Sequence, residues 1–423
     1  MSMRFAWFVT TLVFAGFGCA DWEDPGMTAS GGTSSASGGA TSGGSSALGG
    51  TNGNAGSGSS NSNCSLPRFE TKPVLRGLHV VGNELQDADG NVARLRGVNR
   101  AGSEYACIEG KGFFDGPTDD AAIAAMLTWN VNAVRIPLNE ACWLSINIGN
   151  PRFTGDAYKS AIKTLVSRLE DFGLVPILEL HRAAPGALAA DRLYPMPNAD
   201  HTPDFWRDVA TTFVADDAVV FEPYNEPFPD NNRNSELAWG CWRDGCTHPQ
   251  IMWGDEVAFP EYEAVGMQEL VSTIREAGAP NLILLGGIQY SNRVSRWLEF
   301  APSDPLGNLG AAWHIYNFNS CSNSTCWNNE AAKVAAQVPL VATEIGQDDC
   351  QSGMVNPLMQ FLDEQRASYL AWWWYVSPGN CVPATNSNHG DGVTLSLIDS
   401  YACPTPKGAF GRAIYDHFTQ NAP

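Results

Sequence analysis

Two short apolar runs in this 423-residue chain each lead into a carboxylate. The run Val219–Tyr224 is followed by Asn225, Glu226 and a proline, and the run Leu340–Thr343 is followed by Glu344. Because proline has no N–H to donate, it ends the first run and leaves the amide and the carboxylate at the strand's carboxyl end, where α/β barrels carry their working residues. Two carboxyl groups that face one sugar provide what glycoside hydrolysis needs.

Each signal taken alone has an ordinary structural alternative. Asn-Glu-Pro also occurs as a simple strand-to-loop turn, and a lone glutamate is more often a surface or salt-bridged residue than a catalytic one. The interpretation therefore depends on further polar residues that stand at the ends of other apolar runs. These are Arg135, His181, Asn225, His314, Tyr316 and a tryptophan of the run Trp372–Trp374.

These motifs together resemble those of glycoside hydrolase family 5, the (β/α)8 cellulase family of retaining enzymes, over about residues 74–418. The resemblance implies that Glu226, in Asn-Glu-Pro, is the general acid/base. It also implies that Glu344, in Glu-Ile-Gly, is the nucleophile. The metal-free chemistry of this family implies that no cofactor is required.

The resemblance further implies roles for three side chains around the two glutamates. Arg135 would keep Glu344 ionised, since a fixed guanidinium lowers the pKa of a nearby carboxyl group. Asn225 would donate to the sugar 2-hydroxyl, and Tyr316 would hydrogen-bond the nucleophile. A barrel salt bridge is the structural alternative for the arginine, and a turn cap is the alternative for the asparagine.

Two histidines and a tryptophan complete the expected site. His181 and His314 would orient substrate hydroxyls and the carboxylates, and Trp374, at the end of the last strand, would stack on a sugar ring. Buried core packing is the alternative for each of them, and it is the preferred interpretation for Trp373. Many family members follow the first of these histidines with an aromatic residue, whereas this chain has Arg182 there.

The chain is acidic, with 25 Lys and Arg against 45 Asp and Glu and a formal net charge of −20. This charge would repel a phosphate backbone, so nucleic-acid binding is excluded, whereas a neutral polysaccharide is unaffected by it. The acidity is also consistent with simple solubility of an exported protein.

The amino terminus predicts export. A basic tip at residues 1–4 and an apolar stretch at residues 5–17 are typical of a signal peptide over residues 1–19. Cys19 stands where bacterial lipoproteins carry their lipid-modified cysteine, although cleavage elsewhere would discard it. Residues 20–63 are rich in Gly, Ser and Thr and predict a disordered linker, which leaves residues 64–423 as the catalytic domain.

That domain alternates apolar strand-like runs with amphipathic stretches, which predicts an α/β fold of the (β/α)8 type, a TIM barrel. A hairpin over residues 78–96 would cross the bottom of the barrel. The expected barrel strands are residues 94–98, 133–137, 175–180, 219–224, 282–285, 311–316, 340–344 and 369–375, and representative helices are residues 157–172, 262–277 and 354–365.

Most cysteines and several tryptophans fall in long segments that follow the strands, on the expected catalytic face. Without Cys19, 10 of the 11 cysteines remain, an even number that an oxidising compartment could pair. Their spacing is poor for zinc, so no metal site is expected. The expected pairs are Cys241–Cys246, Cys321–Cys326, Cys107–Cys142, Cys350–Cys381 and Cys64–Cys403. The tryptophans that could expose a ring to sugars are Trp143, Trp239, Trp242, Trp253 and Trp327.

The sequence thus predicts a monomeric, secreted or cell-surface β-glycanase, most simply an endo-β-1,4-glucanase that acts on β-glucan with retention. A β-mannanase is the alternative within the same family. A catalytically silent carbohydrate-binding protein is the alternative outside enzymes, because a fold does not determine function.

Overall fold

The computed structural model describes residues 71–254, 256–381, 383 and 394–421. The expected signal peptide at residues 1–19, Cys19 and the linker at residues 20–63 lie outside the described residues, and so does Cys64. These expectations remain predictions.

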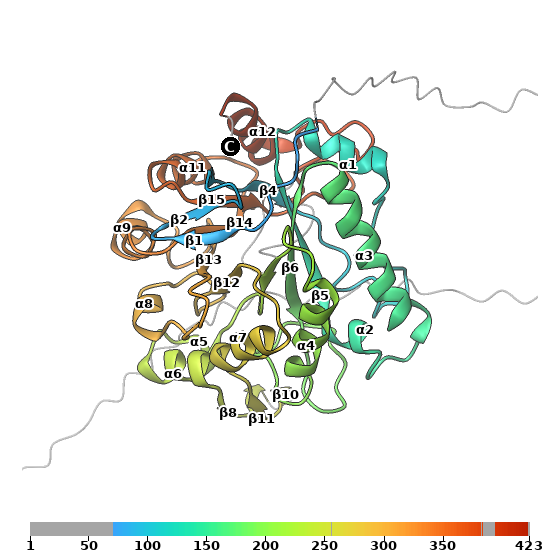
Figure 1. The fold of residues 1–423 in the computed structure, drawn as a ribbon, viewed down its shortest axis with the longest axis vertical. Helices are drawn as coiled ribbons and strands as arrows, with labels where there is room; N and C mark the ends of the chain where they lie inside the picture. Colours follow the sequence, from blue (N-terminus) through green and yellow to red (C-terminus); the bar gives the residue numbers. More distant parts are fainter. Residues whose placement is uncertain (1–70, 255, 382, 384–393, 422–423) are drawn as a thin grey trace, which may run out of the picture. The chain divides into compact units, whose positions relative to one another are not determined.

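Eight parallel strands close into a barrel, which confirms the predicted fold. Neighbouring strands pair in the order β12-β13-β14-β15-β4-β5-β6-β7, so the chain order is kept around the circle. Helices surround the strands (Figure 1). The barrel strands are β4 (Arg96–Asn99), β5 (Ala133–Asn139), β6 (Val175–Arg182), β7 (Val220–Glu222), β12 (Ile283–Gly286), β13 (Leu309–Tyr316), β14 (Leu340–Gly346) and β15 (Ser368–Ala371).

The outer helices bury one apolar face against the barrel, as their spacing predicts. In α3, for example, Ile162, Leu165 and Leu169 are buried, while Lys163 and Thr164 between them are exposed to solvent. The helices are α1 (Asp120–Leu127), α2 (Glu140–Leu144), α3 (Asp156–Asp171), α4 (Thr202–Phe213), α5 (Pro229–Asn232), α6 (Glu236–Asp244), α7 (Met267–Glu276), α8 (Trp297–Phe300), α9 (Ser324–Asn329), α10 (Ala331–Ala335), α11 (Val355–Glu364) and α12 (Gly408–Gln420).

One expected helix is shorter than predicted. The stretch at residues 262–277 begins with a strand, β11 (Tyr262–Ala264), and becomes helical only at Met267 in α7. Strand β11 pairs antiparallel with β8 (Cys246–His248), and a second hairpin joins β9 (Ile251–Trp253) to β10 (Glu256–Phe259). The segment that follows β7 therefore carries its own small sheets, and pairing with them overrides the helical spacing.

A three-stranded antiparallel sheet closes the bottom of the barrel, as predicted. It consists of β1 (His79–Val81), β2 (Glu84–Gln86) and β3 (Val92–Ala93). Leu78 and Leu85 from this region form one buried cluster with residues at the amino-terminal ends of the barrel strands, including Ala133 and Val175. Water is therefore kept from the bottom of the barrel, and the catalytic face is the opposite end.

Four of the five predicted disulfides are present. They are Cys107–Cys142, Cys241–Cys246, Cys321–Cys326 and Cys350–Cys381. Each includes at least one cysteine of a segment that follows a barrel strand, so these bonds brace the catalytic face. The pairing of Cys64 with Cys403 stays a prediction.

No helix among the described residues is long and apolar enough to cross a membrane.

Candidate active site

The two glutamates singled out by their strand-end positions come together in space. Glu344 lies within β14, and Glu226 follows the end of β7 by four residues. A carboxylate oxygen of each and a ring nitrogen of His314 all lie within 4.8 Å of one another. For comparison, carboxyl groups lie about 5–5.5 Å apart in retaining glycosidases and about 6.5–9.5 Å apart in inverting ones.

Glu344 is surrounded by groups that favour its ionised form. Arg135 Nη1 donates to Oε1 at 2.7 Å, and the Tyr316 hydroxyl donates to Oε2 at 2.5 Å. Burial acts to raise the pKa of Glu344. The charges of His314 and Arg135 outweigh it and hold this pKa below its ordinary value. Glu344 is therefore an anion at neutral pH.

Glu226 is in the opposite electrostatic situation. Burial, together with the negative charge of Glu344, raises the pKa of Glu226 above its ordinary value, although a hydrogen bond from His314 partly opposes this. His314 Nδ1 lies 2.9 Å from Glu226 Oε1. Two carboxyl groups whose environments push their pKa values apart are suited to the roles of proton donor and nucleophile.

His314 links the two glutamates as a cation. It is fully buried, and burial alone would lower its pKa, yet Glu344 and the neighbouring carboxylates raise the pKa of His314 to about 9. Both ring nitrogens then carry a proton. Nδ1 donates to Glu226, and Nε2 donates to the Thr343 hydroxyl at 3.1 Å.

Arg135 is held by more partners than the sequence predicted. Besides Glu344, its guanidinium donates from Nε to Glu222 Oε2 at 2.7 Å and from Nη2 to Asn225 Oδ1 at 2.9 Å. Nη2 also lies 3.5 Å from Glu179 Oε2. These residues are buried, so the guanidinium group of Arg135 is held in one orientation.

Glu179 and Glu222 were missed because each lies inside an apolar run rather than at its end. The two-residue alternation of side chains along a strand could have identified them. Ile177 and Val220 belong to the buried cluster inside the barrel, and each of the two glutamates stands two residues later. Side chains two apart share one face of a strand, so both carboxylates point into the barrel.

The Asn225 side chain lies buried between Arg135 and His181. Its Oδ1 accepts from Arg135, so its Nδ2 faces away from the arginine and lies 3.5 Å from His181 Nε2. His181 in turn lies with Nδ1 3.1 Å from Glu179 Oε2 and stacks on Trp372, with ring centroids 5.5 Å apart. Buried surroundings lower the pKa of His181. A neutral imidazole and an amide are thus arranged beside the glutamates.

The prediction that Trp374 stacks on a sugar is wrong. Strand β15 ends at Ala371, so the period of two does not extend to the tryptophans. Trp374 is completely buried and packs edge-on against Trp129, with ring centroids 5.1 Å apart. Trp372 is the partly exposed member of the run and the one beside His181.

The upper-face tryptophans also differ from expectation. Trp143, Trp239, Trp242 and Trp327 are all buried, so these rings anchor loops instead of offering faces to a substrate. The side chain of Trp253 lies outside the described residues.

Arg182, where many relatives have an aromatic residue, is tied to its surroundings. Its guanidinium lies over the Tyr105 ring at 5.7 Å and donates to the Asp191 carbonyl at 2.8 Å. This part of the site is cationic and partly buried.

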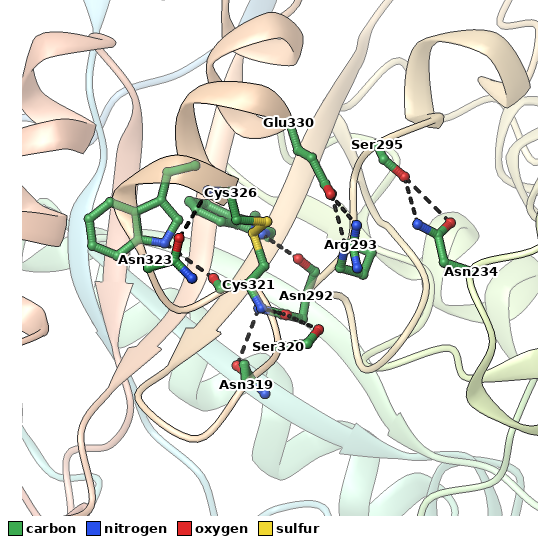
Figure 2. The surroundings of a disulfide bond; sticks show 12 residues. Asn234, Asn292, Arg293, Ser295, Asn319, Ser320, Cys321, Asn323, Cys326 and Glu330 are labelled. Atoms are coloured by element: carbon green, nitrogen blue, oxygen red, sulfur yellow. Dashed lines mark hydrogen bonds and ion pairs between the residues drawn. A yellow bond between two sulfur atoms is a disulfide. The ribbon is translucent and has the colours of Figure 1, made fainter.

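The segment that follows β13 is fixed to the segment that follows β12, which positions His314 and Tyr316. Asn292 donates to the His314 carbonyl at 2.8 Å and accepts from the Cys321 N–H at 2.9 Å. Asn319 accepts from the Tyr316 N–H at 2.7 Å. Figure 2 shows Asn292 and Asn319 beside the Cys321–Cys326 disulfide, with the ion pair of Arg293 and Glu330 nearby.

Two groups in the described structure have spacings compatible with metal ligands. One contains Cys321 and Cys326, which are joined in a disulfide and cannot bind as thiolates. The other contains Glu226, His314 and Glu344, but a histidine protonated at both nitrogens has no lone pair for a metal. We assign a metal to neither.

The fold and this pair of glutamates define a class of proteins, the (β/α)8 glycoside hydrolases. The family model of cellulase (glycosyl hydrolase family 5) matches residues 86–377, more than half of the chain. The chain therefore belongs to glycosyl hydrolase family 5 and is an enzyme that acts on glycosidic bonds. Family membership argues against the alternative of a silent carbohydrate-binding protein.

Similar proteins include enzymes named for two different polymers. A mannan endo-1,4-beta-mannosidase of Salipaludibacillus agaradhaerens is 21% identical over 305 residues, which cover 70% of this chain and 81% of that protein. The beta-glucanase SdGluc5_26A of Saccharophagus degradans superposes with a TM-score of 0.58 at 18% identity, covering 85% of this chain and 99% of that one. A beta-mannanase of Streptomyces thermolilacinus gives a TM-score of 0.54 at 18% identity, covering 82% and 98%.

Proposed function

We propose that this enzyme is a retaining β-glycanase that cleaves β-1,4-linked glucan internally, with Glu226 as general acid/base and Glu344 as nucleophile. The observation that carries the proposal is the close pair of carboxyl groups whose pKa values are shifted in opposite directions. Arg135, His181, Asn225, His314 and Tyr316 surround this pair in the roles of positioning and substrate binding.

In the first step, the ionised Glu344 attacks the anomeric carbon while Glu226 gives its proton to the leaving glycosidic oxygen. His314 donates to Oε1 of Glu226, so the acid's own proton sits on Oε2. The C–O bond to the leaving sugar breaks, and a glycosyl ester of Glu344 forms. The Asn225 amide donates to the 2-hydroxyl of the reacting sugar.

In the second step, Glu226 acts as a base toward water. The charge of Glu344 is one cause of the raised pKa of Glu226, and this charge is lost when the ester forms. The pKa of Glu226 then falls, which favours removal of a proton from the attacking water. The water cleaves the ester and releases the sugar with its original configuration.

Action on a panel of soluble polymers tests the proposed substrate. Reducing sugar and viscosity are measured with carboxymethylcellulose, mixed-linkage β-glucan and mannan. We expect glucan viscosity to fall steeply before much reducing sugar appears, as internal cleavage requires. Release of single sugars at constant viscosity would contradict internal cleavage, and inversion of the first product, seen by NMR, would contradict retention.

A β-mannanase is the second candidate, favoured by the curated mannanase relative and by the polar character of Arg182. A hollow of about 690 Å³ between the segments that follow β13 and β14 has a largely uncharged polar lining, including Asn323, Ser324 and Gln351. Such a lining suits sugar hydroxyls of a branched polymer. Arg182→Trp should shift the ratio of glucan to mannan rates, whereas an unchanged ratio would exclude Arg182 as a determinant.

We also propose that the protein is exported and anchored by a lipid on Cys19. The support is the basic and apolar pattern of residues 1–18 and the disulfides of the described domain, which form in oxidising compartments. Cell fractionation tests this proposal. The wild-type chain should partition with membranes and a Cys19→Ser variant should not, and equal partitioning would contradict the anchor.

A further inference from the structure

Glu222 lies fully buried beneath the catalytic pair and has no part in the two proposed chemical steps. Its Oε2 accepts from Arg135 Nε at 2.7 Å, and its Oε1 accepts from Arg135 Nη2 at 3.3 Å. Oε1 also accepts from the Thr343 hydroxyl at 2.9 Å. Both oxygens of the Glu222 carboxylate therefore accept hydrogen bonds from residues of β5 or β14.

These contacts orient the two cations that face the catalytic glutamates. Because Glu222 occupies Nε and Nη2 of Arg135, the remaining nitrogen, Nη1, points at Glu344, 2.7 Å away. The Thr343 hydroxyl donates its proton to Glu222, so its oxygen accepts from His314 Nε2. The other ring nitrogen of His314 is then left to donate to Glu226.

The charged and titratable groups that face Glu222 are Arg135, Glu179, His314 and Glu344. Glu179 differs from Glu222 although both touch the same arginine. Its nearest contact to Arg135 is longer, at 3.5 Å, and its Oε1 has no hydrogen-bond partner among the described residues. Ionising Glu179 would therefore be costly, because one oxygen of the buried carboxylate would have no hydrogen bond.

The pKa shifts of Glu179 and Glu222 agree with this difference in their contacts. Burial raises the pKa of Glu179 well above its ordinary value, while Arg135 and His314 overcome burial and lower the pKa of Glu222. The two cations, Arg135 and His314, then balance the two anions, Glu222 and Glu344. Glu179 and Glu226, whose pKa values are both raised, complete the cluster.

We propose that Glu222 is a positioning residue, the permanent anion that aims Arg135 at the nucleophile and, through Thr343, aims His314 at the acid/base. The inference rests on the proposed roles of Glu226 and Glu344. It adds that the operating pH range of the enzyme is set by a carboxylate that never touches the substrate.

The test is the pH dependence of kcat/KM for Glu222→Gln, which keeps the size of the side chain and removes its charge. Loss of a neighbouring anion makes proton release easier from every group in the cluster, so both limbs of the bell-shaped profile should move to lower pH. For charges several ångströms apart in a protein of effective dielectric constant about 20, Coulomb's law gives a shift of roughly one to two pH units. The optimal kcat/KM should fall about 10- to 100-fold, because Arg135 and Thr343 lose a charged partner.

Glu179→Gln is the matched control, since it alters a buried glutamate on the same arginine without removing a charge. Its pH limits should stay at the wild-type values whatever happens to its rate. If Glu179→Gln moves the limits and Glu222→Gln does not, the fixed anion is Glu179 and the proposal is overturned.

A second pair of variants covers the case in which Glu222→Gln does not fold. Thr343→Val removes the hydroxyl that orients His314, so the hydrogen bond that lowers the pKa of Glu226 weakens and the basic limb should move to higher pH. Thr343→Ser keeps the hydroxyl and should behave like wild type. Unchanged limits in every folded variant, with lower rates, would show that Glu222 and Thr343 only pack the barrel. Turnover by Glu344→Ala would instead refute the proposed function itself.

Discussion

At the scale of single residues, the two glutamates proposed as catalytic differ in what surrounds them, although their side chains are identical. Arg135 and Tyr316 bind the oxygens of Glu344, while Glu226 receives one hydrogen bond from His314 and faces the negative charge of Glu344. The pKa of this side chain is therefore lowered at Glu344 and raised at Glu226.

This difference predicts distinct consequences for the two alanine variants. Glu344→Ala should lower kcat by at least about 10⁴-fold on every substrate, because no carboxylate remains to attack. Glu226→Ala should be as impaired on polysaccharides but should retain much more activity on aryl glycosides, whose leaving groups need no proton. The measurement is kcat on both kinds of substrate, and equal losses on both would contradict the assigned roles.

Trp372 and Trp374 offer a matched pair with different environments. Trp372 is partly exposed beside His181, so Trp372→Ala should lower kcat/KM roughly tenfold through lost ring stacking and change stability little. Trp374 is fully buried, so Trp374→Ala should cost about 3–5 kcal/mol of unfolding free energy. Enzyme kinetics combined with denaturant unfolding separates the two, and a loss of stability in Trp372→Ala alone would contradict the assignment.

At the scale of elements, the barrel strands carry an apolar layer below a charged one. Ala133, Ile177, Val220 and Ala312 lie in the interior cluster, and Arg135, Glu179, Glu222 and His314 follow each of them by two positions. The charged layer lies toward the carboxyl ends of the strands and the apolar layer is sealed by β1 to β3. The alternation of side chains along the strands thus places both the apolar core of the barrel and the charged residues of the candidate active site.

Asp363, at the end of α11, joins the last elements of the chain to the strands that close the barrel. It accepts from Arg94, Arg96 and Tyr369 on one oxygen and lies 2.9 Å from His417 Nε2 on the other. Burial opposes ionisation, but His417, Arg96 and Tyr369 lower the pKa of Asp363 well below its ordinary range.

We therefore expect Asp363→Asn to destabilise the protein by about 1–3 kcal/mol at pH 7, because the bonds to a charged acceptor are lost. The depressed folded-state pKa means that this contribution is present above about pH 4 and is lost as the pH falls through the folded pKa. Denaturant unfolding at pH 7 and pH 3 measures it. Asp416→Asn, whose side chain on α12 is half-exposed, is the control and should stay within about 0.5 kcal/mol of wild type. A variant difference at pH 3 as large as at pH 7 would contradict the assignment.

At the scale of the whole molecule, the disulfides close loops of different lengths in the chain. Cys107–Cys142 spans 35 residues and joins the segments that follow β4 and β5, whereas Cys321–Cys326 spans 5 residues within one loop. Longer closed loops restrict the unfolded chain more.

Replacement of both Cys107 and Cys142 by alanine should therefore cost about 3–4 kcal/mol, and the same change at Cys321 and Cys326 only about 2 kcal/mol. Denaturant midpoints of the two double variants, compared with wild type, provide the measurement. If the short loop proves the more stabilising, then native contacts such as those of Asn292, and not unfolded-state entropy, dominate.

The sequence by itself determined the barrel and the residues at its strand ends. The period of two in apolar runs is a local signal, and it predicted the strands that carry Arg135 and Glu344. Cysteine spacing and position after the strands predicted the four disulfides that are present. Local signals report which residues share a strand face, since that depends only on neighbours along the chain.

Only the tertiary structure decided which polar groups inside the barrel pair with one another and which tryptophans are exposed. Glu179 and Glu222 gained their roles from Arg135 on a neighbouring strand, and Trp374 was buried by Trp129, about 245 positions earlier in the chain. Charge balance and burial depend on groups brought together through space, and their energies come from the whole set of neighbours in a medium of low dielectric constant. No spacing along the chain encodes that set.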